Sequence, residues 1–235
     1  MNRMGRIVLA GLLLLAGTGP LPGALQAQED AFNIELGVAY RDFRLEIERR
    51  NDLPPFREQA TFTAFAPRPQ VHLALATREH LTASGENGWQ VLLELEPFRL
   101  GRQQTSHGPA DLGTRAEGTY GFLALPLFHK SGPFKFGVAP GLDFLEVSGQ
   151  ARFHAEGADP SPATAKTAFS RHQTLDDFLG SPFRVILFFV EIQELFGGFL
   201  RVTALGSRIE DWSESRNTAT IYRITSTNAV YAWAF

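Results

Sequence analysis

The chain of 235 residues contains no cysteine and no run of 18 apolar residues. Without thiols, the sequence excludes a disulfide scaffold, a zinc finger, an iron–sulfur cluster and a cysteine nucleophile. Without a long apolar run, it excludes a protein that crosses a membrane with helices. Charged residues make up 20% and hydrophobic residues 44% of the chain, and this balance excludes a disordered or collagen-like protein.

The first 27 residues have the composition of an export signal. Arg3 and Arg6 form a short basic region, and residues 7–17 form an apolar stretch that is too short to span a bilayer. Proline and glycine then interrupt the chain before a group of small residues that ends at Ala27. We expect cleavage near Ala27, which divides the chain into a signal peptide (1–27) and one mature domain (28–235). A short buried helix is the alternative.

The mature domain offers little chemistry for nucleic acids or metals. Once Arg3 and Arg6 are removed, 20 basic residues remain against 25 acidic ones, whereas nucleic-acid binding needs a concentrated basic surface. The six histidines are scattered, and no two of them have the spacing of three to five residues that is typical of metal ligands. We therefore expect no nucleic-acid partner, no metal and no cofactor.

Alternation with a period of two residues recurs along the mature domain, and no helical period of useful length appears. Large apolar side chains alternate with small or charged ones in residues 32–41, 71–76, 89–96, 134–144 and 230–235. A soluble sandwich would carry many bulky charges on its outer face. Here the second face holds glycine, alanine and isolated charges, which suit a crowded interior. This pattern predicts a transmembrane barrel that is apolar outside and small or polar inside.

Short and long polar links alternate between the predicted strands, as in membrane barrels with short periplasmic turns and long external loops. We expect an all-β, antiparallel up-and-down barrel of eight strands with both termini in the periplasm. Ten strands result if residues 61–66 and 71–77 are separate strands around Pro67 and Pro69. Residues 183–192 are apolar on both faces, and their β-branched and aromatic content favours a strand over a buried helix or plug. The expected strands are 31–47, 60–78, 89–104, 117–128, 133–148, 183–191, 199–209 and 218–235.

The last eight residues (NAVYAWAF) place Tyr231, Trp233 and Phe235 at alternate positions. This segment resembles the closing strand of Gram-negative outer-membrane β-barrel proteins, which ends in an aromatic residue, most often phenylalanine. The whole mature domain is similar to small members of that class. The resemblance implies that these three residues are read by the barrel-assembly machinery after export through the secretion translocon. It also implies a location in the cell outer membrane, in contact with its lipid and lipopolysaccharide.

Charged residues on the inward face would lie in a lumen that, with eight strands, is only wide enough for side chains. An isolated buried charge is costly, so these groups must pair. We expect an internal network of ion pairs and hydrogen bonds that fills the barrel, with a proton or ion path as the alternative. The predicted network consists of Glu35, Arg41, His72, Glu94, Glu96, Lys135, Asp143 and Arg201.

The tryptophans and tyrosines are expected to anchor the barrel at the membrane surfaces, because amphipathic rings favour the headgroup level. We therefore expect a non-enzymatic membrane protein that acts structurally or through its external loops. The expected anchors are Trp89, Trp212, Trp233, Tyr40, Tyr120, Tyr222 and Tyr231.

Two other functions remain open. Outer-membrane lipid A deacylases use a serine, a histidine and a carboxylate on a barrel. Ser170 and His172 share one face of an extended segment, and Asp176 or Asp177 would orient the imidazole. Against this, the segment belongs to an expected external loop, and no oxyanion site is evident. The other alternative is a soluble periplasmic β-barrel that binds an apolar ligand inside.

Overall fold

The computed structural model describes residues 32–52, 55–63, 69–173, 178, 184–213 and 218–235. The expected signal peptide and its cleavage site lie outside the described residues. In the described part of the chain, no helix is long and apolar enough to cross a membrane. The strands are β1 (Phe32–Asp52), β2 (Pro55–Thr63), β3 (Pro69–Thr77), β4 (His80–Leu81), β5 (Asn87–Trp89), β6 (Leu92–Leu100), β7 (Gln103–Thr105), β8 (Gly108–Ala110), β9 (Arg115–Ala124), β10 (Leu127–Ser131), β11 (Phe134–Ala151), β12 (His154–Ala155), β13 (Thr167–Arg171), β14 (Val185–Leu195), β15 (Gly198–Ser213) and β16 (Thr218–Ala234).

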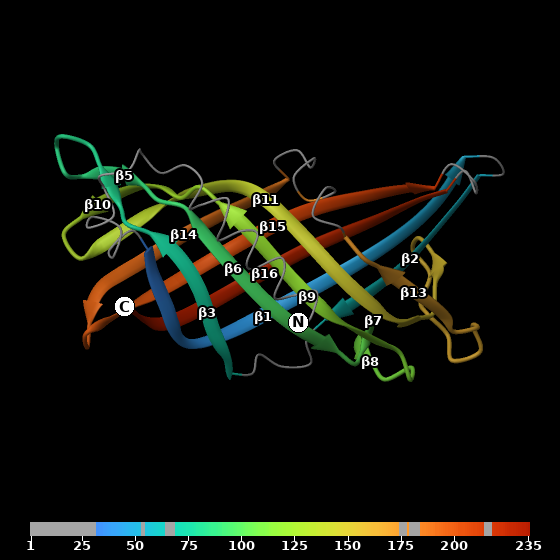
Figure 1. Ribbon diagram of the computed structural model, residues 1–235. Coiled ribbons are helices and arrows are strands. Elements are labelled where there is room, and N and C mark those ends of the chain that lie inside the picture. The colour runs from blue at the N-terminus through green and yellow to red at the C-terminus, as the bar shows by residue number, and fades with distance from the viewer. Residues whose placement is uncertain (1–31, 53–54, 64–68, 174–177, 179–183, 214–217) are drawn as a thin grey trace, which may run out of the picture.

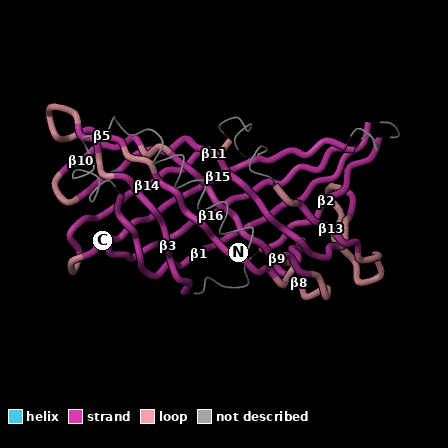
Figure 2. Tube along the Cα trace, viewed as in Figure 1, coloured by secondary structure: helices cyan, strands magenta, loops and turns pink. Residues whose placement is uncertain are grey.

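Eight of these strands form a closed ring in chain order, as Figures 1 and 2 show. The ring is β1, β3, β6, β9, β11, β14, β15 and β16, and β16 pairs with β1 over most of its length. The pairing of β11 with β14 completes the barrel wall between them. Every pairing is antiparallel, so the predicted eight-stranded up-and-down barrel is confirmed.

The second strand of the ring is divided, but the barrel does not gain strands. Strand β2 pairs with β1 from Arg44 to Asp52, and β3 pairs with β1 from Phe32 to Tyr40. The two strands therefore follow one another along the same edge of β1. The division predicted around the two prolines is present, because β3 begins at Pro69, yet the ring keeps eight strands rather than ten.

The two ends of the barrel differ. One end, at the left of Figure 1, holds the C-terminus and the short turns near residues 82–86, 131–134 and 195–198. We call the half of the barrel nearest this end the terminal half. The longer links lie at the opposite end, and we call the half nearest that end the loop half. This arrangement matches the predicted alternation of short and long links.

The apolar segment 183–192 is a strand where the structure describes it. Within β14, Val185, Leu187 and Phe189 are buried, and the residues between them are exposed. Ile186 is 54% exposed and Phe188 57% exposed. The strand predicted for this segment is therefore confirmed, and its two apolar faces serve the barrel interior and the outer surface.

The outer surface of the terminal half is a band of apolar side chains. On β1, Ile34 and Tyr40 are more than half exposed, although a soluble protein would bury them. The side chains at the odd-numbered positions between them point inward and include Glu35 and Ala39. This arrangement is that of a transmembrane barrel, in which lipid covers the outer face. The apolar band comprises Ile34, Leu36, Val38, Tyr40, Val71, Leu73, Phe136, Val138, Ile186, Phe188, Val190, Val202 and Trp233.

The polarity of β1 reverses after Tyr40. Asp42 and Arg44 are exposed on the outside, whereas Phe43, Leu45 and Ile47 are buried inside. The barrel wall therefore continues into the loop half with a water-facing exterior and an apolar interior. We expected small and polar residues to line the interior along the whole length of the strands. They line it only in the terminal half.

This reversal explains why two of the expected interface anchors lie in the interior of the barrel. Tyr120 is fully buried and Tyr222 is 3% exposed, because both occupy inward positions in the loop half. The ring of Tyr120 packs beside those of Phe43 and Phe122, with centroids 6.1 and 6.2 Å away. The prediction for these two tyrosines was wrong. Trp89, Trp212, Trp233 and Tyr40 are exposed, and their role as anchors stays a prediction.

Candidate functional site

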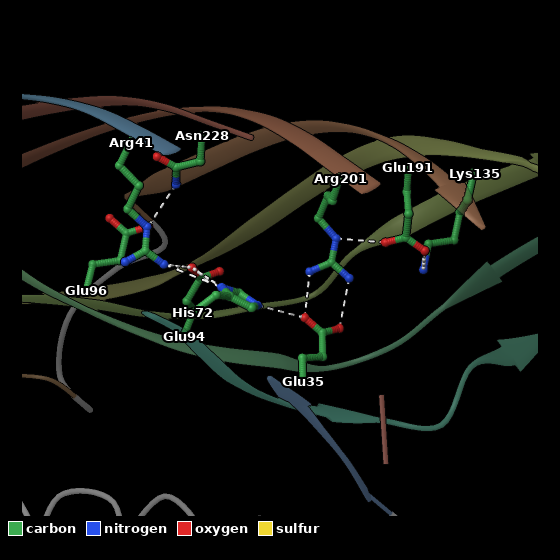
Figure 3. A network of polar contacts seen from close by, with 9 residues as sticks. All are labelled: Glu35, Arg41, His72, Glu94, Glu96, Lys135, Glu191, Arg201 and Asn228. Atoms are coloured by element: carbon green, nitrogen blue, oxygen red, sulfur yellow. Dashed lines mark hydrogen bonds and ion pairs between the residues drawn. The ribbon is translucent and has the colours of Figure 1, made fainter. Parts of the chain in front are cut away.

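A chain of buried charges crosses the interior of the terminal half (Figure 3). At its centre, His72 of β3 is completely buried between two carboxylates. Its Nε2 lies 3.3 Å from Oε2 of Glu35 on β1, and its Nδ1 lies 3.2 Å from Oε1 of Glu94 on β6. Three neighbouring strands are thus tied together by one imidazole.

Arg201 of β15 extends this chain past β16, the strand that lies between β15 and β1. Its two terminal nitrogens donate to the two oxygens of Glu35 at 2.8 and 2.9 Å, which is the paired geometry that guanidinium favours. Its Nε donates to Glu191 of β14 at 2.7 Å. Lys135 of β11 then lies 2.9 Å from Glu191 and 3.0 Å from Glu79.

The other branch begins at Arg41 of β1. Its Nη2 donates to Glu94 at 2.6 Å, and its Nε lies 3.4 Å from Glu96. The side-chain amide of Asn228 on β16 donates to Glu96 at 2.8 Å. With both branches included, the chain of charges joins every strand of the ring except β9.

At the mouth of the terminal half, Glu79 ends the chain between two lysines. Besides Lys135, it contacts the ammonium group of Lys130. Burial alone would raise the pKa of Glu79, but Lys135 and Lys130 hold that pKa below its ordinary value. The carboxylate is therefore ionised here and is matched by cations on both sides.

Taken together, groups of the two signs are nearly equal in number. Five carboxylates face four lysine and arginine groups, and His72 lies between two of the carboxylates. Such balance is required because an unpaired charge in a buried site is strongly unfavourable. Among the described residues, no group of three or more histidine, aspartate or glutamate side chains is arranged to hold a metal ion.

The structure brings seven of the eight predicted lumen residues into this chain and places Asp143 apart from it. Asp143 is fully buried, and it accepts hydrogen bonds from the hydroxyl groups of Tyr120, at 3.2 Å, and Ser207. It follows Lys135 by eight residues on the same strand, which is about 26 Å at roughly 3.3 Å per residue. It is therefore too far from Lys135 to join that part of the chain. Towards the Glu96 part of the chain, Tyr120 lies opposite Glu96 in the register and holds Asp143 by its hydroxyl group.

Sequence reasoning missed Glu79, Lys130, Glu191 and Asn228. Glu191 could have been found, because it is an inward residue by the alternation of β14 and lies directly opposite Lys135 in the register. Asn228 occupies an inward position on the last strand. Glu79 and Lys130 lie near turns, where alternation gives no indication of direction.

Beyond the chain of charges, the interior of the loop half is filled by apolar side chains. The rings of Phe43 and Phe98 stack with centroids 4.7 Å apart, and Phe62 packs against Phe169 of β13. Larger buried members of this apolar core are Phe43, Leu45, Ile47, Phe62, Phe98, Tyr120, Phe122, Leu145, Phe169, Ile209 and Ile224.

The residues considered for a serine hydrolase lie on the outer surface of the loop half. Ser170 and His172 are both exposed, and Nδ1 of His172 lies 3.2 Å from Oε1 of Glu146 on β11. Glu146 is thus a carboxylate partner that sequence reasoning did not consider, while Asp176 and Asp177 lie outside the described residues. Within the described part of the chain, Ser170 makes no hydrogen bond to His172.

The three aromatic residues of the predicted assembly signal lie where β16 meets β1. Tyr231 donates its hydroxyl to the carbonyl of Leu195 at 3.0 Å, and its ring meets that of Trp233 edge-on at 4.9 Å. The backbone of Phe235 exchanges hydrogen bonds with Ile34 at 3.0 and 3.1 Å. The last residues therefore help to close the barrel.

Comparison with known proteins gives structural likeness but no sequence relative. No protein-family model and no curated protein matches the chain. Ail, the attachment invasion locus protein of Yersinia pestis, is 9% identical with a TM-score of 0.36 over 88% of this chain and 100% of its own. Neisserial surface protein A is 9% identical (TM-score 0.31; 83% and 97% covered), and the outer membrane protease OmpT of Escherichia coli is 8% identical (TM-score 0.41; 88% and 98% covered). The fold of this chain therefore rests on the register of its own strands and on the direction of its own side chains.

Proposed function

We propose that this chain is an integral outer-membrane protein with a filled lumen, which acts structurally or through its external loops and performs no catalysis. The observation that carries this proposal is that the strands with an apolar outer band hold a chain of paired charges on their inner face. A soluble barrel that holds an apolar ligand would have the opposite arrangement at that level. Antiparallel barrels of this kind span bacterial outer membranes.

Two layers of side chains support the filled lumen. In the terminal half, ion pairs link residues of strands that are not neighbours in the ring, such as Glu35 of β1 and Arg201 of β15. In the loop half, aromatic and aliphatic side chains are packed to near-zero exposure. Eight-stranded barrels have room for such side chains and little else, whereas water-filled channels belong to wider barrels.

The proposal predicts a barrel that does not conduct ions. In planar lipid bilayers, the purified protein is expected to give no steady conductance, because its interior side chains leave no continuous path for ions. A porin added to the same bilayer shows that a channel would be detected. Steady unitary currents from the protein would contradict the filled lumen. Loss of an acyl chain from lipid A in cells that produce it, prevented by Ser170→Ala, would contradict the non-catalytic role.

We also propose that Tyr231, Trp233 and Phe235 are the signal by which the barrel-assembly machinery recognises the chain, after the secretion translocon exports it under the direction of residues 1–27. Their position on the strand that closes the ring supports this role, because closure is the last pairing that assembly must complete. Phe235 is 74% exposed, so its ring is accessible to a partner.

A further inference from the structure

A depression of about 360 Å³ lies on the outer surface of the loop half, over β9, β11 and β13. Outward side chains of these strands form rows across the sheet, because their registers coincide. Small residues (Ser148, Ser170 and Ala168) occupy the centre and one side, and longer polar residues surround them. The first row is Arg115, Gln150 and Ala168, and the second is Glu117, Ser148 and Ser170. Next to the second row, Glu146 pairs with Thr119 and its carboxylate contacts His172.

Several polar side chains in this depression are not used by the fold. Among the described residues, Arg115, Ser148, Gln150 and Ser170 make no side-chain hydrogen bond or ion pair. Elsewhere on the loop half, exposed arginines are paired. Arg223 contacts Glu46 at 2.6 Å and Glu48 at 2.7 Å, and Arg50 contacts Glu210 at 2.8 Å. The depression thus combines free donors and acceptors from three strands in one concave place.

The depression also has a defined position along the barrel axis, relative to the apolar band. Directly toward the terminal half, the ring of Phe144 lies against Gly121, and the edge of Phe178 meets Phe144 at 6.1 Å between centroids. The next outward pair in the register is Leu142 and Leu123, which belongs to the apolar level. The polar rows therefore begin where the lipid-facing surface ends, which is the level of lipid headgroups on the loop side.

We propose that this depression binds a saccharide that carries an anionic group. Serine hydroxyls and the Gln150 amide both donate and accept hydrogen bonds, as the many hydroxyl groups of a sugar require. Arg115 supplies a cation with a free fork of donors for a phosphate or carboxylate substituent. The size of the depression falls within the range of small-ligand sites, which begins at about 300 Å³. This site is separate from the lumen and goes beyond the proposed function.

The two sources of such a saccharide are a glycolipid of the same membrane and a free glycan, and two probes distinguish them. The protein is placed in phosphatidylcholine nanodiscs, and its binding to a soluble phosphorylated core oligosaccharide and to intact lipopolysaccharide is measured. The variant Ser148→Tyr fills the centre of the depression and is expected to weaken binding at least tenfold. The control Thr225→Tyr, at an exposed outward position of β16, is expected to change it less than twofold.

Arg115→Gln provides a second variant that does not alter the shape of the sheet. It is expected to weaken binding of the phosphorylated oligosaccharide and to leave binding of the dephosphorylated one unchanged. Binding of either probe with this dependence supports the site, and a preference for intact lipopolysaccharide identifies the membrane as the source. Binding of neither probe, or equal effects of Ser148→Tyr and Thr225→Tyr, would overturn the proposal and leave the function of the barrel untouched.

Discussion

Replacing Arg201 with methionine is expected to lower the free energy of unfolding by about 3–5 kcal/mol, because it leaves buried charges without a partner. Arg201 holds both oxygens of Glu35 and one oxygen of Glu191 in the lumen. No water can solvate these carboxylates when the guanidinium is removed, since both residues are at most 3% exposed. The measurement is a urea titration of the protein in liposomes, followed by tryptophan fluorescence.

A matched control separates this effect from a general loss of charge. Arg208→Met removes an arginine from the same strand, but its partner Glu210 is also exposed, so we expect a loss of about 1 kcal/mol or less. Adding Glu35→Gln and Glu191→Gln to Arg201→Met is expected to restore much of the stability, because the uncompensated charges are then gone. Equal losses for Arg201→Met and Arg208→Met would show that the lumen charges are not paired as described.

Replacing Gly37 with valine is expected to prevent closure of the barrel between β1 and β16. A Cβ atom at this inward position would meet the carbonyl of Tyr231 and lie 2.5 Å from Cα of Ala232. Both contacts are with backbone, which cannot move away without breaking the pairing of the two strands. Overpacking typically costs about 1–3 kcal/mol where side chains can adjust, and a larger loss is expected here.

The test is the change in gel mobility on boiling, which reports the fraction of closed barrel. Gly206→Val is the control, because nothing lies within 4 Å of a Cβ atom at that outward position. We expect Gly206→Val to retain the mobility shift and Gly37→Val to lose most of it. Normal closure of Gly37→Val would mean that the two strands do not meet in this register.

The barrel and the inward set of charges could be predicted because alternation fixes the direction of each side chain once one face is known. Alternation places Glu35, His72 and Glu94 in the lumen, and there the two ring nitrogens of His72 lie 3.3 Å from Glu35 and 3.2 Å from Glu94. The inward direction of a side chain does not give its position along the barrel axis. Asp143 shares its face with Lys135 but lies at a different level, among Tyr120 and Ser207.

The change of surroundings along the strands was harder to predict. Residues 34–40 of β1 place their apolar side chains at even positions, and residues 43–47 place them at odd positions. This shift marks the point where the outer surface passes from lipid to water, and it decides that Tyr120 and Tyr222 are interior residues. The depression on β9, β11 and β13 was beyond prediction, since it depends on the register of a third strand formed by loop residues.

The lipid-facing direction of the apolar band is the feature on which the whole interpretation depends, and the absence of native cysteine makes it measurable. A nitroxide spin label is attached to Phe188→Cys or to Arg208→Cys, and its collisions with oxygen and with a water-soluble nickel complex are compared in liposomes. We expect the label at position 188 to collide with oxygen and to be shielded from nickel, and the label at position 208 to be open to nickel. A label at position 188 that is reached by nickel, or shielded from both reagents, would contradict a barrel whose large apolar side chains face the membrane.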